Sequence, residues 1–155
     1  VHNRRYLDEQ LGARLGEAAR YEMPFSIGLL DIDHFKLVND AHGHLAGDRV
    51  LQETASIIRK QMRKEDVLVR YGGEEFAVML PQTDRLGSAI LCERIREAIA
   101  EHSFDIDAKS LRITVSVGVA SYPLDDAAEP EQLVAISDKR LYQAKEAGRN
   151  QSVFE

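Results

Sequence analysis

The sequence predicts an α+β domain in which helices flank an antiparallel central sheet. "FSIGLLDID" (residues 25–33) has the continuous apolar middle of a strand buried on both faces. "DVLVRYGGEEFAVMLP" (residues 66–81) places a glycine pair between two apolar runs, as in a hairpin whose turn needs positive φ values. With apolar residues at helical spacing between the strands, the order after a leading helix is βαββαβ. This order is the split βαβ, ferredoxin-like arrangement, and we expect its helices to pack on one face of the sheet.

The first two helices are predicted from apolar residues that recur every three or four positions. The leading helix ends before Pro24, because the residue before a proline disfavours helical backbone. Its apolar positions are Leu7, Leu11, Leu15 and Ala18. The next helix begins at Asp48, and its apolar positions are Leu51, Ala55, Ile58 and Met62.

The second half of the chain repeats the pattern of helix, strand and helix. Thr83 or Asp84 is suited to cap a helix. The apolar positions of that helix are Leu91, Ile95, Ala98 and Ile99. Residues 111–123 are rich in β-branched side chains and predict the last strand. A final helix opens near Pro130 and closes at Gly148, following the preference for proline at the start and glycine at the end.

Composition limits the class of protein. The chain has 155 residues, 44% of them hydrophobic, which suits one compact domain over residues 1–155. Its 26 acidic and 20 basic residues give a net charge of -6. This charge argues against binding nucleic acid or an anionic membrane through bulk electrostatics, so any phosphate ligand must be held by local groups.

The compartment and the wider protein are also expectations from the sequence. The single Cys92 cannot form an internal disulfide and lies among apolar residues, so we expect a core thiol in a cytoplasmic protein. No apolar run approaches the ~18 residues of a membrane helix, so we expect no membrane contact from this domain. Because the chain begins with Val1, we expect it to be a piece of a longer regulatory protein, and we expect any sensor or membrane anchor of that protein to lie outside this domain.

Four carboxylates are predicted to lie at one end of the sheet: Asp31, Asp33, Glu74 and Glu75. In the split βαβ topology the first strand lies beside the hairpin strands, so its end approaches the glycine turn. Two carboxylates ~4 Å apart repel by about 4 kcal/mol at an effective dielectric near 20, so the cluster should take up protons or hold a cation. Oxygen ligands favour Mg²⁺ when phosphates complete its shell. The alternative is a solvated acidic turn, since exposed glutamates are common.

Phosphate-binding signals are local and individually weak. The chain lacks G-x-x-x-x-G-K-[ST] and G-x-G-x-x-G, but the first amides of a short helix after Asp33 could face phosphate, with Lys36 nearby. Lys145 and Arg149 lie four apart at a helix end, where the helix dipole favours cations in any case. Three histidines suggest a rival zinc site without a cysteine pair, and local hydrogen bonds are their commoner role. They are His34, His42 and His44.

Several motifs in register closely resemble the GGDEF family of diguanylate cyclases. The motifs are "LLDIDHFKLVNDAHGHLAGDRVL", "RKEDVLVRYGGEEF", "TVSVGVA" and "LYQAKEAGRN". The resemblance runs from about Asn3 to Asn150. It implies a domain similar to the palm of class III nucleotide cyclases, which joins two GTP molecules into cyclic di-GMP and releases pyrophosphate.

The resemblance also implies roles for the carboxylates and glycines. Asp31, Glu74 and the carbonyl of Ile32 would hold two Mg²⁺ ions, with Mn²⁺ as an alternative, although Glu74 stands where the family name has aspartate. Glu75 would be the general base or a further metal ligand. Two glycines would leave room for the α-phosphate, namely Gly72 and Gly73.

The family's substrate-binding positions are filled by competent residues. Asn39 and Asp48 match the guanine-reading positions, and a carboxylate can accept from guanine N1 and its exocyclic amine, which adenine cannot match. The β- and γ-phosphates would be held by the amides around two residues and by three basic side chains. These are His34 and Phe35, and then Lys36, Lys145 and Arg149.

"RKED" matches the family's R-x-x-D site of inhibition by cyclic di-GMP. Arg63 can bind phosphate or stack on guanine, Asp66 can pair with the guanine edge, and Arg94 would be a second contact. The alternative is a plain surface ion pair, which would contribute little.

Catalysis by this family requires a homodimer, because each domain holds one GTP. The segment before the domain controls that encounter, and the D-x-L-T-G-L run that usually precedes "NRR" is not in this sequence. A catalytically silent module that senses GTP or cyclic di-GMP is the main alternative, although the signature residues are intact. An RNA-binding role is weak because strand aromatics are scarce and the charge is negative.

Overall fold

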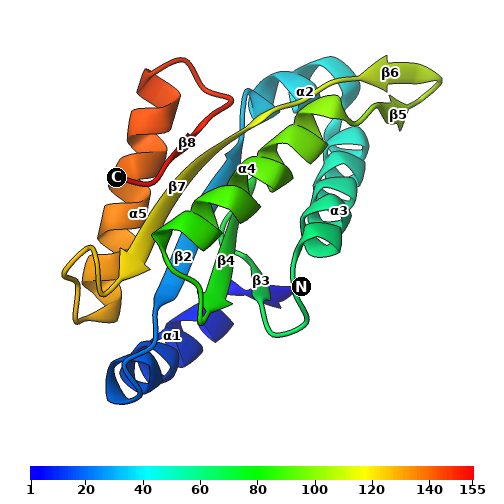
Figure 1. Ribbon diagram of the computed structural model, residues 1–155. Helices are drawn as coiled ribbons and strands as arrows, with labels where there is room; N and C mark the ends of the chain where they lie inside the picture. The colour runs from blue at the N-terminus through cyan, green and yellow to red at the C-terminus, as the bar shows by residue number, and fades with distance from the viewer.

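The computed structural model describes all residues 1–155 and contains a six-stranded sheet with the order β1-β3-β4-β2-β7-β8 (Figure 1). The four central strands are antiparallel to one another. At the edges, the short β1 pairs in parallel with β3 and the short β8 pairs in parallel with β7. The strands are β1 (His2–Asn3), β2 (Phe25–Ile32), β3 (Val67–Arg70), β4 (Glu75–Pro81), β7 (Val115–Tyr122) and β8 (Ser152–Val153). The helices are α1 (Arg4–Arg20), α2 (Phe35–His42), α3 (His44–Gln61), α4 (Arg85–Glu101) and α5 (Pro130–Glu146). The α+β class and the antiparallel central sheet are confirmed.

The split βαβ order is also present. The chain runs β2, α3, β3, β4, α4 and β7, and these strands lie side by side as β3-β4-β2-β7. β2 is therefore central, with the hairpin strand β4 on one side and β7 on the other. All eight residues of β2 are buried, as the apolar run predicted.

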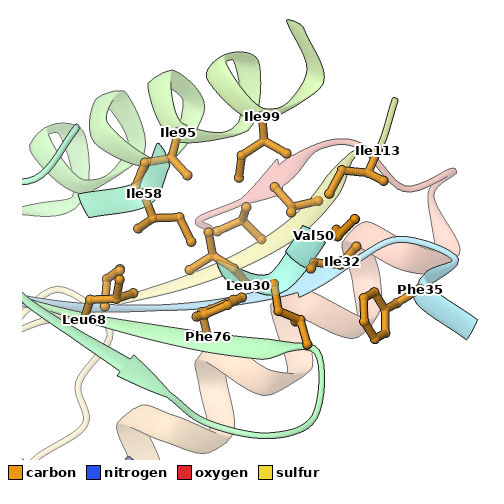
Figure 2. Close-up of a cluster of buried hydrophobic side chains, with 14 of the residues drawn as sticks. Leu30, Ile32, Phe35, Val50, Ile58, Leu68, Phe76, Ile95, Ile99 and Ile113 are labelled. Atoms are coloured by element: carbon orange, nitrogen blue, oxygen red, sulfur yellow. The ribbon is translucent and has the colours of Figure 1, made fainter. Parts of the chain in front are cut away.

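The two helices within the βαββαβ order, α3 and α4, pack on one face of the sheet, as expected. The core also has a second part on the opposite face, which the sequence did not predict. One part joins the sheet to α3 and α4, and Figure 2 shows side chains of both helices, such as Ile58 and Ile95, facing strand residues Leu30 and Phe76. The other part joins the opposite face to α1 and α5, through residues that include Leu11 and Leu141. A sheet with apolar side chains on both faces needs a helical layer on each.

The helix starts agree with the predictions at two of three places. Asp84 caps α4 by accepting a hydrogen bond from the Gly87 amide (2.8 Å), and α5 begins at Pro130. The helix predicted from Asp48 begins four residues earlier, and the short α2 precedes it. Gly43 separates the two helices with a φ of 87°, a left-handed value that favours glycine.

One further prediction is wrong, and one element of the structure was not predicted. Neither glycine of the hairpin turn has a left-handed φ, so the predicted reason for the pair is wrong. Instead, the amides of Tyr71 and Gly72 both donate to the Glu75 carbonyl (2.9 and 3.1 Å) and close the turn. A small hairpin of β5 (Phe104–Ile106) and β6 (Lys109–Leu111) precedes β7 and was not predicted.

Cys92 is a core thiol, as predicted. It is fully buried against the sheet, and burial raises the pKa of its thiol to about 12, so it stays protonated and unreactive at neutral pH. None of the helices is long and apolar enough to cross a membrane.

Candidate active site

The site lies where β2 and β4 end beside each other. Asp31 and Glu75 are direct partners in the antiparallel register, which brings two carboxylates from distant parts of the chain to adjacent positions. Lys145, from the last turn of α5, places its Nζ 2.7 Å from Asp31 Oδ2. The Asp31 side chain is only 9% exposed. A carboxylate this deeply buried requires a cationic partner, and Lys145 supplies it.

Burial and the neighbouring carboxylate of Asp31 both make Glu75 a weaker acid. Burial raises the pKa of the Glu75 carboxyl, and the negative charge and a hydrogen bond of Asp31 raise it further, while Lys145 opposes the shift. Burial is thus the main reason why the protonated form of Glu75 is favoured, and the charge of Asp31 adds to it.

Glu74 joins this group through its backbone. The Ile32 amide donates to the Glu74 carbonyl at 3.2 Å, so the glycine turn is attached to the end of β2 next to Asp31. No group of three or more His, Cys, Asp or Glu side chains is arranged to hold a metal, so metal binding by Asp31 and Glu74 stays a prediction. The same observation means that the histidines form no zinc site in the structure. The ammonium group of Lys145 on Asp31 shows that this carboxylate is placed to face a cation.

The start of α2 fits the predicted phosphate site. His34 occupies the N-cap with a left-handed φ of 56°, and no side chain caps the helix. The first amides of a helix have no partner within it, so those at Phe35 and Lys36 are available to a ligand. Both His34 and Lys36 are exposed.

The Asp33 carboxylate is occupied by hydrogen bonds within the protein, and these connect β7 and the segment after α5 to the end of β2. Its carboxylate accepts hydrogen bonds from the hydroxyls of Thr114 (2.7 Å) and Ser116 (2.6 Å) and from the Asn150 amide (3.0 Å). The segment after α5, with Arg149 in a left-handed conformation, is thereby fixed near the start of α2. Asp33 thus has the supporting role of a positioning residue.

The two predicted guanine readers lie on neighbouring helices. Asn39 is half-buried on α2, and Asp48 is exposed on α3. Between them, a Cβ added at Gly47 would lie 1.9 Å from Asn39 Oδ1 and 3.2 Å from Phe35 Cζ. Sequence reasoning missed Gly47, and the available signal was a glycine inside a predicted helix, which usually has a packing reason.

α5 is anchored by residues that sequence reasoning also missed. A Cβ at Gly118 would lie 2.1 Å from the Ser137 carbonyl oxygen, so glycine lets the helix approach β7 closely. The Ser137 hydroxyl donates to the Gly118 carbonyl (2.7 Å). Close packing of α5 on β7 determines where its last turn, and hence Lys145, lies.

The residues of the predicted inhibitory site share one pocket of about 340 Å³. Asp66 is buried and accepts from the Arg63 amide (2.7 Å) and guanidinium (3.1 Å), and Arg94 lines the same pocket. Arg63 also donates to the Thr83 hydroxyl (2.6 Å). Arg63 also donates to the carbonyl of Pro81 (2.8 Å). Pro81 lies at the opposite end of β4 from Glu75, a separation of roughly 20 Å for a six-residue step along a strand.

The sheet with helices on both faces and the acidic end of β2 and β4 define a palm-like cyclase domain. Comparison with known proteins gives the family: the chain belongs to the family described as "Diguanylate cyclase, GGDEF domain", whose model matches residues 1–151.

Among curated relatives, Diguanylate cyclase A of Treponema denticola is 46% identical over 125 residues, or 81% of this chain. Diguanylate cyclase DgcP of Pseudomonas aeruginosa is 41% identical over 148 residues, or 96% of this chain. The matched parts are 33% and 22% of those two proteins, so the chain corresponds to one portion of each.

Solved structures match over nearly the whole chain. The active GGEEF domain of a diguanylate cyclase from Vibrio cholerae has a TM-score of 0.92 and 35% identity, covering 99% of this chain and 97% of that one. The GGDEF domain of DgcB from Caulobacter crescentus, in complex with c-di-GMP, has a TM-score of 0.91 and 32% identity, covering 97% of this chain and 86% of that one.

Proposed function

We propose that this domain is a diguanylate cyclase, which condenses two GTP molecules into cyclic di-GMP and releases two pyrophosphates. The observation that carries the proposal is the pairing of Asp31 and Glu75 across β2 and β4, because it puts two carboxylates at the glycine turn of a GGDEF domain. The similar GGDEF domain of DgcB is in complex with c-di-GMP, which supports the choice of product.

Asp31, Glu74 and the carbonyl of Ile32 would hold two Mg²⁺ ions, or Mn²⁺ in their place. Bound metal would neutralise the triphosphate and polarise the α-phosphate. The donor set supports this proposal, because it consists of oxygens, the ligands that Mg²⁺ prefers, and because Asp31 faces the ammonium group of Lys145 in the structure.

Glu75 is the candidate general base. Its raised pKa suits an acceptor that takes the proton of the ribose 3′-hydroxyl as that oxygen attacks the α-phosphorus. The new bond joins the 3′-oxygen to phosphorus, and the bond to the leaving pyrophosphate breaks. A second such step, in the opposite direction, closes the ring.

The substrate is held by groups around the same end of the sheet. Asn39 and Asp48 would read guanine, while Gly72 and Gly73 leave space for the α-phosphate; a Cβ at Gly73 would meet nothing within 4 Å. The other phosphates would be bound by the first amides of α2 and by basic side chains. These groups are at His34, Phe35, Lys36, Lys145 and Arg149.

Each domain presents one nucleotide site, so turnover requires a homodimer in which two GTP molecules face each other. An N-terminal regulatory segment of the longer protein would control that encounter, and the reaction would take place in the cytoplasm, where GTP is available. Arg63, Asp66 and Arg94 would bind cyclic di-GMP and limit its own synthesis.

The test is incubation of concentrated protein with GTP and Mg²⁺, with chromatographic detection of cyclic di-GMP. The wild-type protein should form product and Glu75→Ala should not. Absence of product from a wild type shown to be dimeric would reject the proposal. Tight binding of cyclic di-GMP by calorimetry in that case would favour a silent sensing module.

A further inference from the structure

We propose that Lys145 has two alternating partners, so that it occupies the Asp31 carboxylate when no nucleotide is bound and keeps free divalent metal out of the site. The inference rests on the proposed function, because it assumes that a metal and a triphosphate bind here. It goes beyond that function by stating that metal enters only together with nucleotide.

The contact that carries the inference is the ion pair between Lys145 Nζ and Asp31 Oδ2, at 2.7 Å. Asp31 is almost completely enclosed, whereas the Lys145 side chain is 30% exposed. The lysine therefore reaches the carboxylate from the solvent side, which is the side from which an ion must come.

The surrounding groups show why the pairing is exclusive. A divalent ion on Asp31 Oδ2 would stand next to the ammonium group, and two like charges at contact distance repel strongly in a half-buried site. The lysine must leave before the ion can bind. The other carboxylate beside this pair belongs to Glu75, the register partner of Asp31 on β4.

A bound triphosphate removes this obstacle. Lys145 lies in the last turn of α5, and its long flexible stem allows the ammonium to turn from Asp31 to a phosphate oxygen without moving the helix. The nucleotide thus supplies a new partner for the lysine at the same moment as the metal supplies a new partner for the aspartate. Charge at Asp31 remains balanced in both states, and the fixed position of α5 on β7 through Gly118 makes the exchange a side-chain event.

The experiment measures binding of Mn²⁺ to nucleotide-free protein, by calorimetry or by the spectrum of the free ion. Lys145→Met removes the competing charge at similar length, and we expect it to bind Mn²⁺ at least about tenfold more tightly than wild type. Lys145→Arg retains a cation and should bind as weakly as wild type. Asp31→Asn in the Lys145→Met background should abolish the gain, which assigns it to this site.

Lys139 supplies a matched control, since it lies on the exposed surface of the same helix. Lys139→Met should leave Mn²⁺ affinity unchanged. If Lys145→Met is too unstable to measure, Lys145→Gln keeps a hydrogen bond to Asp31 without the charge and should show the same gain.

An unchanged Mn²⁺ affinity in folded Lys145→Met or Lys145→Gln would overturn the inference, because Lys145 would then be only a structural partner of Asp31. The Mn²⁺ measurement can be distinguished from a test of the proposed cyclase activity. An active cyclase whose variants show no gain loses this inference alone, whereas an inactive protein whose variants show the gain loses the proposed function alone.

Discussion

Replacing Gly47 by alanine should separate the stability of the domain from its recognition of guanine. The added Cβ would lie 1.9 Å from Asn39 Oδ1, a distance that no structure tolerates, so the Asn39 side chain must turn away. The clashing atom is the end of a flexible side chain, and Phe35 Cζ at 3.2 Å needs to move only slightly. Alanine also favours a helix interior over glycine by roughly 0.5–1 kcal/mol, so the free energy of unfolding should change by less than about 1 kcal/mol.

The loss of binding should be much larger than the change in stability. If Asn39 reads guanine, its displacement removes one hydrogen bond in a half-buried site, which costs about 1–3 kcal/mol of binding free energy. The dissociation constant of the nucleotide should therefore rise roughly 5- to 150-fold. Calorimetry with a non-reactive GTP analogue measures this constant, and urea unfolding measures stability.

Gly16→Ala is the matched control, because its added Cβ would meet nothing within 4 Å on the exposed side of α1. It should stabilise the domain slightly and leave nucleotide binding unchanged. In an Asn39→Ala background, Gly47→Ala should cause no further loss. Undiminished analogue binding by folded Gly47→Ala would refute the reasoning that Asn39 must occupy this position.

Three further predictions concern charge and packing. Because the folded protein raises the pKa of Glu75, its ionisation destabilises the fold as pH rises through that pKa; Glu75→Gln should melt higher than wild type at pH 8, with the difference vanishing near pH 4. A melting-temperature series across pH tests this, and a constant difference would contradict it. Asp66→Ala should cost about 1–3 kcal/mol in urea unfolding, because a buried acceptor of a backbone amide is lost; a neutral effect would show that Asp66 serves only the ligand. Gly118→Ala should cost about 1–3 kcal/mol or more, since the clash is with the backbone of Ser137, and wild-type stability would show that α5 can shift freely.

The sequence predicted those parts of the fold that depend on local pattern. The apolar run ending at Asp31 predicted a central strand, and the topology that followed placed its end beside Glu75, as the register confirms. The Asp84 cap and the start at Pro130 were predicted because capping depends on residues within one turn.

The features that the sequence did not predict arise from contacts between helices and strands that are distant in the chain. Helices on both faces follow from the complete burial of β2, yet the pattern of each helix alone does not say which face it covers. The position of Gly47 became meaningful only when α2 and α3 were brought together, since its constraint comes from Asn39. The hairpin glycines were explained by turn geometry, whereas their φ values show that this geometry does not require them.

The roles of the site residues were implied by the family resemblance, and the structure adds where they lie. Asp31, Glu75 and Lys145 meet at one end of the sheet, and Arg63, Asp66 and Arg94 meet at the other. The contact of Lys145 with Asp31 could not be predicted, because it joins residues 114 positions apart through the packing of α5.

The most direct test of the account is the initial rate of cyclic di-GMP formation as a function of protein concentration, at saturating GTP and Mg²⁺. If two domains must face each other, the rate should rise with the square of concentration while the protein is mostly monomeric, and Glu75→Gln should form no product at any concentration. A rate that is only proportional to concentration in that monomeric range, or product formation that persists in Glu75→Gln, would contradict it.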